Sequence, residues 1–134
     1  MAATNGFDLA AFDGFNAAQN DGVAIEIVHP GTGEPLGVTI TVAGPDSDQA
    51  KKADRAMINR RLKAQKTKML TAEELQAEAL RKLAACVLSW EGMVSDGKPL
   101  ECITENAVLA FERAPWLAEQ VAEAAGNRAA FFTS

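Results

Sequence analysis

The chain has 134 residues, an ordinary composition and a net charge of -5 at pH 7, which together favour one domain. No run of 18 apolar residues is present, which argues against a transmembrane helix. The first residues lack the basic and apolar regions of a signal peptide, so a cytoplasmic protein is expected.

The net charge hides a strong segregation along the chain. Residues 1–50 contain seven acidic and no basic residues, whereas residues 51–82 contain ten basic and four acidic residues. Residues 83–134 are acidic again, with seven acidic and three basic residues. A basic middle between acidic flanks can bind nucleic acid, an acidic protein, or the acidic parts of the chain itself.

The N-terminal part combines an arm with a predicted hairpin. Residues 1–20 carry a few Phe among Ala, Asn, Gly and Asp, and we expect a flexible acidic arm there. Residues 23–28 and 37–43 alternate apolar and polar side chains, which is typical of half-buried strands. The turn-forming sequence between them predicts a β-hairpin over residues 23–43.

Two long helices are predicted next. The first covers about 47–66, with Asp46 as the N-cap and a Gln three residues later, as in a capping box. The second covers about 72–91, where Thr71 and a following Glu form the same signature and an apolar stripe recurs with helical spacing. The second helix is therefore expected to be the central core helix.

The C-terminal part predicts a turn and two more helices. The turn at 96–99 contains Asp-Gly and ends the preceding helix, so the segment reads as a hinge between packed helices. Helices follow at about 105–113 and 115–130, the latter beginning with a Pro, which suits a first helical turn. We therefore expect an α+β, mainly α fold: one domain over residues 21–134, with an N-terminal β-hairpin followed by about four helices.

No catalytic, cofactor-binding or metal-binding set is recognisable. His29 is the single histidine and lies beside a Pro in a predicted loop, without a nucleophile elbow nearby. Cys86 and Cys102 match neither a zinc spacing nor a redox CxxC. The glycine-rich stretch after His29 lacks the Gly-Lys-Ser/Thr ending of a phosphate loop. An enzyme is the weakest interpretation, and no cofactor is expected.

The basic helix and the aromatic side chains are the candidate interaction residues. Arg60 and Arg61 lie in the basic helix, which has no aromatic residue nearby for base stacking, so a solvated or protein-facing helix is favoured over a nucleic-acid-binding one. Four aromatic residues are candidates for either core packing or a protein contact. These are Trp90, Trp116, Phe131 and Phe132.

Several segments in order resemble a known family. A helix ending in LAACVLSWEG is followed by a DGKPLE turn and by TENAVLAFERAPWLAEQVAEAAGNRAAFF, and the VTITVAGPDSD junction precedes them. This order resembles the tail assembly chaperone family of long-tailed (siphovirus-like) bacteriophages, from Asp46 to Phe132. The resemblance implies a protein that acts in the host cytoplasm, binds and solubilises the tape measure protein, and helps recruit tail tube subunits. Many such chaperones also exist in a longer, frameshifted form.

The resemblance leads to a hypothesis about the binding site and leaves alternatives open. A groove between the helices at 72–90 and 115–130, including Trp90, Trp116 and Phe131, would hold a helix of the tape measure protein. The basic helix would meet an acidic partner or a neighbouring copy in a homo-oligomer. The alternatives are a structural tail or head–tail connector protein of the virion, and a nucleic-acid-binding regulator that uses the basic helix.

Overall fold

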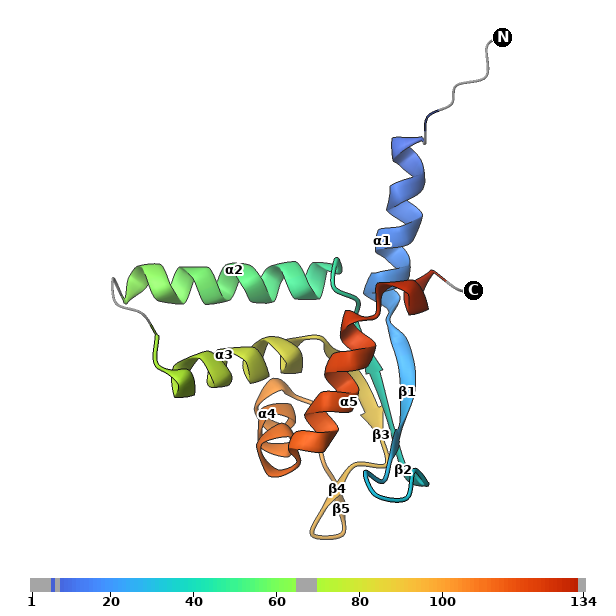
Figure 1. The fold of residues 1–134 in the computed structure, drawn as a ribbon, viewed down its shortest axis with the longest axis vertical. Coiled ribbons are helices and arrows are strands. Elements are labelled where there is room, and N and C mark those ends of the chain that lie inside the picture. Colours follow the sequence, from blue (N-terminus) through green and yellow to red (C-terminus); the bar gives the residue numbers. More distant parts are fainter. Residues whose placement is uncertain (1–5, 7, 65–69, 133–134) are drawn as a thin grey trace.

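The structure, a computed structural model, describes residue 6 and residues 8–64 and 70–132. A small sheet stands beside α5, while α1 and the paired helices α2 and α3 project from this body in different directions (Figure 1). The α-helices are α1 (Phe12–Asp21), α2 (Asp48–Lys63), α3 (Ala72–Ala85), α4 (Thr104–Arg113) and α5 (Pro115–Gly126). The strands are β1 (Val23–Val28), β2 (Pro35–Val42), β3 (Val87–Glu91), β4 (Val94–Ser95) and β5 (Lys98–Pro99). Two short 3₁₀ helices are η1 (Leu9–Ala11) and η2 (Arg128–Phe131).

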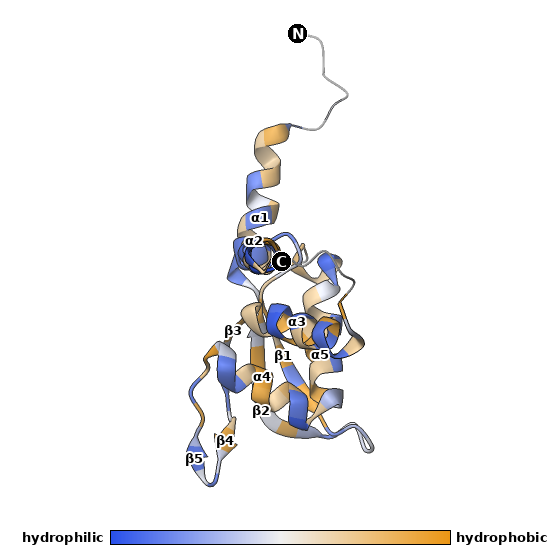
Figure 2. Cartoon of the chain, turned by 90° about the vertical axis from the view of Figure 1, so that its left-hand side faces the viewer, coloured by the Kyte–Doolittle hydropathy of each residue, from blue (hydrophilic) through white to orange (hydrophobic). Residues whose placement is uncertain are grey.

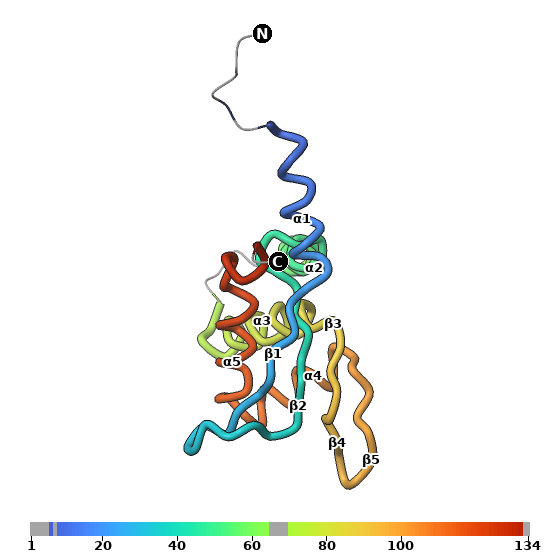
Figure 3. Tube along the Cα trace, turned by 90° about the vertical axis from the view of Figure 1, so that its right-hand side faces the viewer, coloured from blue at the N-terminus to red at the C-terminus, as the bar shows by residue number. Residues whose placement is uncertain are grey.

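The main sheet is antiparallel, with the strand order β1-β2-β3 (Figure 3). Ile40 at its centre lies opposite Ile25 of β1 and Trp90 of β3. The alternation that predicts β2 places Ile40 and Val42 in the core, where they are fully buried. Helices α3, α4 and α5 complete this core with small and large apolar side chains: Ala84, Ala107, Phe111, Leu117, Ala118 and Val121.

The expected fold, an N-terminal hairpin followed by about four helices, is wrong. Helix α1 precedes the strands, the hairpin gains β3 as a third strand, and β4 and β5 form a second small sheet. The described residues contain five α-helices. A lone hairpin leaves its apolar face and both edges uncovered. Here β3 covers one edge by pairing with β2, and the helices cover the apolar face.

The helix predicted over 72–91 is the clearest correction, because α3 ends at Ala85 and residues 87–91 form β3. The helical stripe of the sequence continues through Val87, but β-branched and aromatic residues at 87–90 also suit a strand. Pairing with β2 decides between the two, since it places Trp90 opposite Ile40. Local spacing could not reveal this long-range pairing.

The expectation of a flexible arm over residues 1–20 also needs correction where the structure describes it. Residues 12–21 form α1, preceded by η1, whose N-cap Asp8 accepts a hydrogen bond from the Ala10 N–H. The helix ends at Gly22, which has a φ of +83°. Its last turn is fixed to the body by the fully buried Gln19. Residues 1–5 and 7 of the expected arm lie outside the described residues.

Helices α2 and α3 form an antiparallel pair that extends to one side of the body (Figure 1). The N-cap of α2 is Ser47, not the predicted Asp46, and its hydroxyl accepts the Ala50 N–H. The capping box predicted for α3 is confirmed, because Thr71 and Glu74 each accept a backbone N–H from the other. Residues 65–66 of the first predicted helix fall outside the described residues.

The predicted Asp96-Gly97 turn joins β4 to β5. Asp96 and Gly97 have positive φ values of 50° and 79°, as the two central residues of a type I′ turn require. The Trp90 indole N–H donates to the Leu100 carbonyl at 2.8 Å and fixes the base of this small hairpin to β3. The chain then returns through α4 to α5, whose first residue is Pro115, as predicted.

Candidate protein-binding surface

A groove runs between α3 and α5 beside the beginning of α2, and we call it the helical groove. Its volume is about 460 Å³, and its lining is mostly apolar. Half of the twelve lining residues are alanine or glycine, and two leucines and two charged residues are among the others. They are Pro45, Ala50, Ala79, Leu80, Lys82, Leu83, Cys86, Ala118, Glu119, Ala122, Ala125 and Gly126.

The alanine spacing of the sequence produces this groove. Ala118, Ala122 and Ala125 are four and three residues apart, so they share one face of α5. On α3, Ala79 and Leu83 stand in the same relation. Small side chains on two neighbouring helices let a third backbone approach closely, and the leucines offer apolar contact area.

Cys86 lies at the end of α3 in this lining. Burial raises the pKa of its thiol, so the group is neutral and behaves as a small apolar side chain at neutral pH. The charges of Lys82 and Glu119 belong to exposed residues. The helical groove is thus an apolar channel with one cation and one anion beside it.

His29, the single histidine, lies outside the lining of the helical groove. His29 is exposed in the β1–β2 loop, where its Nδ1 accepts the Gly31 and Thr32 N–H groups at 3.0 and 3.2 Å. Within the described ranges, no group of three or more His, Cys, Asp or Glu side chains is placed to hold a metal ion. The arrangement is suited to binding a polypeptide by shape and apolar contact.

The structure separates the four predicted aromatic residues. Trp90 is half-buried in β3, and Trp116 is half-buried in the first turn of α5. Phe131 is buried in the core, whereas Phe132 is exposed. The helical groove lies between the two helices that the hypothesis named, but its lining contains none of these four side chains.

The two predicted arginines differ in their surroundings. Arg61 pairs with Glu78 of α3, through its Nη2 at 2.5 Å and its Nε at 3.4 Å. Its hydrogen bond lowers the pKa of the Glu78 carboxyl. Arg60 is exposed on α2 and lines a separate depression between α2 and α3. Arg61 therefore holds the helix pair together, and Arg60 is the better placed of the two for a partner.

An exposed apolar patch lies on α1, where the sequence analysis expected a flexible arm carrying a few Phe. Leu9, Phe12 and Phe15 are exposed along η1 and α1, which stand clear of the body (Figure 2). The ring centroids of Phe15 and Phe132 lie 4.9 Å apart, so the patch continues onto Phe132, which directly follows η2. The signal was present in the sequence as the three-residue spacing of Phe12 and Phe15, which predicts one helical face.

Comparison with known proteins adds no family to these observations. No protein-family model matches the chain, and no similar curated protein or solved structure was found. Within the described ranges, none of the helices is long and apolar enough to cross a membrane.

Proposed function

We propose that the protein is a phage tail assembly chaperone that acts in the host cytoplasm. It binds an apolar helical segment of the tape measure protein in the helical groove and keeps that protein soluble. It also helps to recruit tail tube subunits while the tail is built. It takes no part in catalysis.

The helical groove is the observation that carries this proposal. Ala79, Ala118 and Ala122 leave room for a helix backbone, and Leu80 and Leu83 cover its apolar side chains. Recognition of this kind buries one apolar stripe of the ligand helix, with contacts spaced three and four residues apart. A protein that spans a phage tail as a long helical rod exposes many such stripes before assembly.

The charged exterior supports the solubilising role. Arg61 with Glu78 and Lys82 with Asp54 form ion pairs between α2 and α3. Beside the groove, α2 and α3 keep exposed charged side chains such as Arg60 and Lys82. A complex with such a surface stays dispersed where the free tape measure protein would aggregate.

The family resemblance is the second support. Its quoted segments cover the β2–α2 junction, the end of α3 with β3, the β4–β5 hairpin, α4, α5 and η2. The segment LAACVLSWEG, which the resemblance takes as a helix end, runs from α3 into β3. Of these elements, α5 and the end of α3 line the helical groove, so part of the resembling sequence lies at the proposed binding site.

The test is co-purification from cells that build the phage. The tagged protein should recover the tape measure protein, and the bait should be absent from finished virions. Ala79→Arg and Ala122→Arg replace exposed alanines in the groove and should abolish recovery. Ala56→Arg, at an exposed site on α2 outside the groove, is the matched control and should recover it normally. Equal recovery by all variants would contradict the groove assignment.

A structural tail or head–tail connector protein is the second candidate. The exposed patch of Leu9, Phe12, Phe15 and Phe132 favours it, because a permanent subunit contact would bury such a patch. Mass spectrometry of purified particles separates the two candidates, since a structural protein remains in them. The nucleic-acid-binding regulator has less support, because acidic side chains already pair with Arg61 and Lys82.

A further inference from the structure

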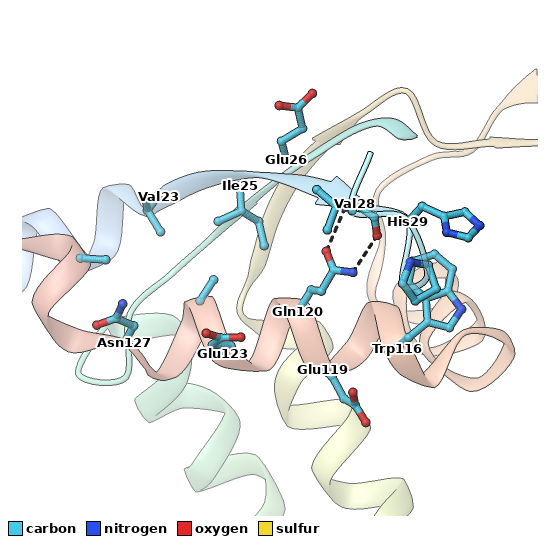
Figure 4. A pocket seen from close by; sticks show the side chains of 14 residues that line it. Val23, Ile25, Glu26, Val28, His29, Trp116, Glu119, Gln120, Glu123 and Asn127 are labelled. Atoms are coloured by element: carbon cyan, nitrogen blue, oxygen red, sulfur yellow. Dashed lines mark hydrogen bonds between the residues drawn. The ribbon is translucent and has the colours of Figure 1, made fainter. Parts of the chain in front are cut away.

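Strand β1 forms an edge of the sheet, and a side chain occupies part of that edge. Gln120 of α5 bonds to both peptide groups of Val28: the Val28 N–H donates to Oε1 at 3.0 Å, and Nε2 donates to the Val28 carbonyl at 2.9 Å (Figure 4). A carboxamide has the same donor and acceptor as a peptide group. Gln120 therefore takes the place of one residue of a fourth strand.

A groove lies along the same edge, between β1 and α5, and we call it the edge groove. Its volume of about 660 Å³ falls within the range of about 300–1,000 Å³ usual for ligand sites. Val23, Ile25 and Val28 of β1 and Trp116 and Ala124 of α5 give it an apolar surface. Since an edge strand has unpaired peptide groups along one side, an extended peptide fits here better than a helix.

The charge around the edge groove is acidic. Its lining includes Glu26, Glu119 and Glu123 and, in the described part of the chain, neither Lys nor Arg. Figure 4 places Glu26 beyond β1 and Glu119 on the far side of α5, so carboxylates flank the groove on both sides. Such a surface attracts a chain with basic side chains and repels an acidic one.

We propose that the edge groove binds an extended, basic segment of a partner protein, which pairs with β1 as an additional strand and displaces the Gln120 side chain. The peptide groups of β1 provide the hydrogen bonds. The carboxylates select Lys or Arg, and the apolar wall takes the side chains between them.

This second site goes beyond the chaperone proposal and does not depend on it. The helical groove uses Ala122 and Ala125 of α5, whereas Gln120, Glu123 and Ala124 serve the edge groove. Glu119 borders both grooves and is therefore left unchanged in the test. A single protein would then hold a helical and an extended partner at once.

The probe is a short blocked peptide of alternating Lys and Val, titrated into the isotope-labelled protein. Saturable binding is expected, with shifts of the Val28 amide and the Gln120 side-chain NH₂ signals. A peptide with Glu in place of Lys should not bind, and backbone N-methylation along one edge should abolish binding because it removes the strand donors. Binding that tolerates N-methylation, or that leaves Val28 unchanged, would overturn the proposal.

Two variants separate the strand contact from the charge. Glu26→Gln with Glu123→Gln alters two exposed side chains and should weaken peptide binding by about threefold to tenfold. Gln120→Ala removes the competing carboxamide and should tighten binding by about twofold to tenfold. Weaker binding by Gln120→Ala in a folded protein, or no effect of the double variant, would count against the proposal. The double variant and the methylated peptide remain decisive if Gln120→Ala misfolds.

Discussion

Arg128 donates two hydrogen bonds to the Asp46 carboxylate, from Nε to Oδ2 at 2.6 Å and from Nη2 to Oδ1 at 3.0 Å. Asp46 lies just before α2, and Arg128 begins η2, so the pair connects the C-terminal segment to the middle of the chain. Gln19 joins the same carboxylate through its Nε2, at 3.1 Å. One side chain thus links α1, the β2–α2 junction and the C-terminal segment.

This junction predicts a pH dependence of stability. The hydrogen bond from Arg128, and then that from Gln19, lower the pKa of the Asp46 carboxyl below its usual value. Its contribution to the free energy of unfolding is therefore present above the unfolded pKa of about 3.9 and is lost as the pH falls through the folded pKa. Asp46→Asn should lower the unfolding temperature at pH 7, and the difference from the parent protein should shrink as the pH falls below 4.

Thermal unfolding followed by circular dichroism over this pH range measures the effect. Asn16→Ala, at an exposed and non-titrating site on α1, is the control and should leave the pH profile unchanged. A difference between Asp46→Asn and the parent that stays constant from pH 7 to pH 3 would contradict the assignment.

The second prediction concerns the stability that the buried Gln19 side chain contributes. Its Oε1 accepts the Asp46 N–H at 2.6 Å, and a Cβ added at Gly44 would lie only 2.6 Å from the same oxygen, so the site is tightly packed. Gln19→Ala should destabilise the protein by about 1–3 kcal/mol, because it leaves a part-buried donor without its partner.

Hydrogen exchange locates this loss. The amides of α1 should exchange faster in Gln19→Ala than in the parent, since the helix loses its attachment to the body. Asn16→Ala, at an exposed site on the same helix, should change neither the stability nor the exchange beyond the effect of helix propensity. Unchanged protection of α1 in Gln19→Ala would show that other contacts hold this helix.

Local signals in the sequence predict where several elements begin. Thr71 and Glu74 mark the start of α3, Pro115 marks the start of α5, and alternation marks β2. Each signal depends on neighbours within about four residues, which is the range over which capping and periodicity act. Such signals locate the element ends that local hydrogen bonds determine.

The missed features depend on contacts between distant residues. Residues 87–91 become a strand because β2 offers a partner, and α1 is held by Gln19 against residues 44–46. The sequence analysis expected a groove between the helices at 72–90 and 115–130, and the helical groove lies between α3 and α5, but the aromatic side chains expected in it are not part of its lining. The sequence analysis chose large aromatic residues as candidates for the groove. The groove instead forms where the side chains are small, as at Ala118 and Ala122.

Trp90 provides a third prediction, which tests its role in the structure. Trp90→Phe keeps an aromatic ring opposite Ile40 but removes the N–H that donates to the Leu100 carbonyl. A loss of about 0.5–1.5 kcal/mol is expected from the hydrogen bond, measured by denaturant unfolding. The amides of β4 and β5 should exchange faster, because this bond fixes their base to β3. Equal stability and unchanged exchange would show that the ring alone holds the hairpin.

The fourth prediction concerns the close approach of Gly92, which follows β3, to the backbone of Gly37 in β2. Gly92 follows β3 with a φ of +84°, and a Cβ added there would lie 2.0 Å from the Gly37 carbonyl oxygen. Gly92→Ala must therefore adopt a strained φ and push β2 away from β3, and a loss of about 3 kcal/mol or more is expected.

Gly97→Ala is the matched control for Gly92→Ala. Gly97 has a similar φ of +79°, but no heavy atom lies within 4 Å of an added Cβ. Gly97→Ala introduces the backbone strain alone and should lower the free energy of unfolding by about 1–2 kcal/mol. The larger loss expected for Gly92→Ala therefore measures the steric contact between β3 and β2. Denaturant unfolding of both variants gives this difference directly. Equal losses would mean that β3 does not approach Gly37 closely, and the three-stranded sheet would have to be revised.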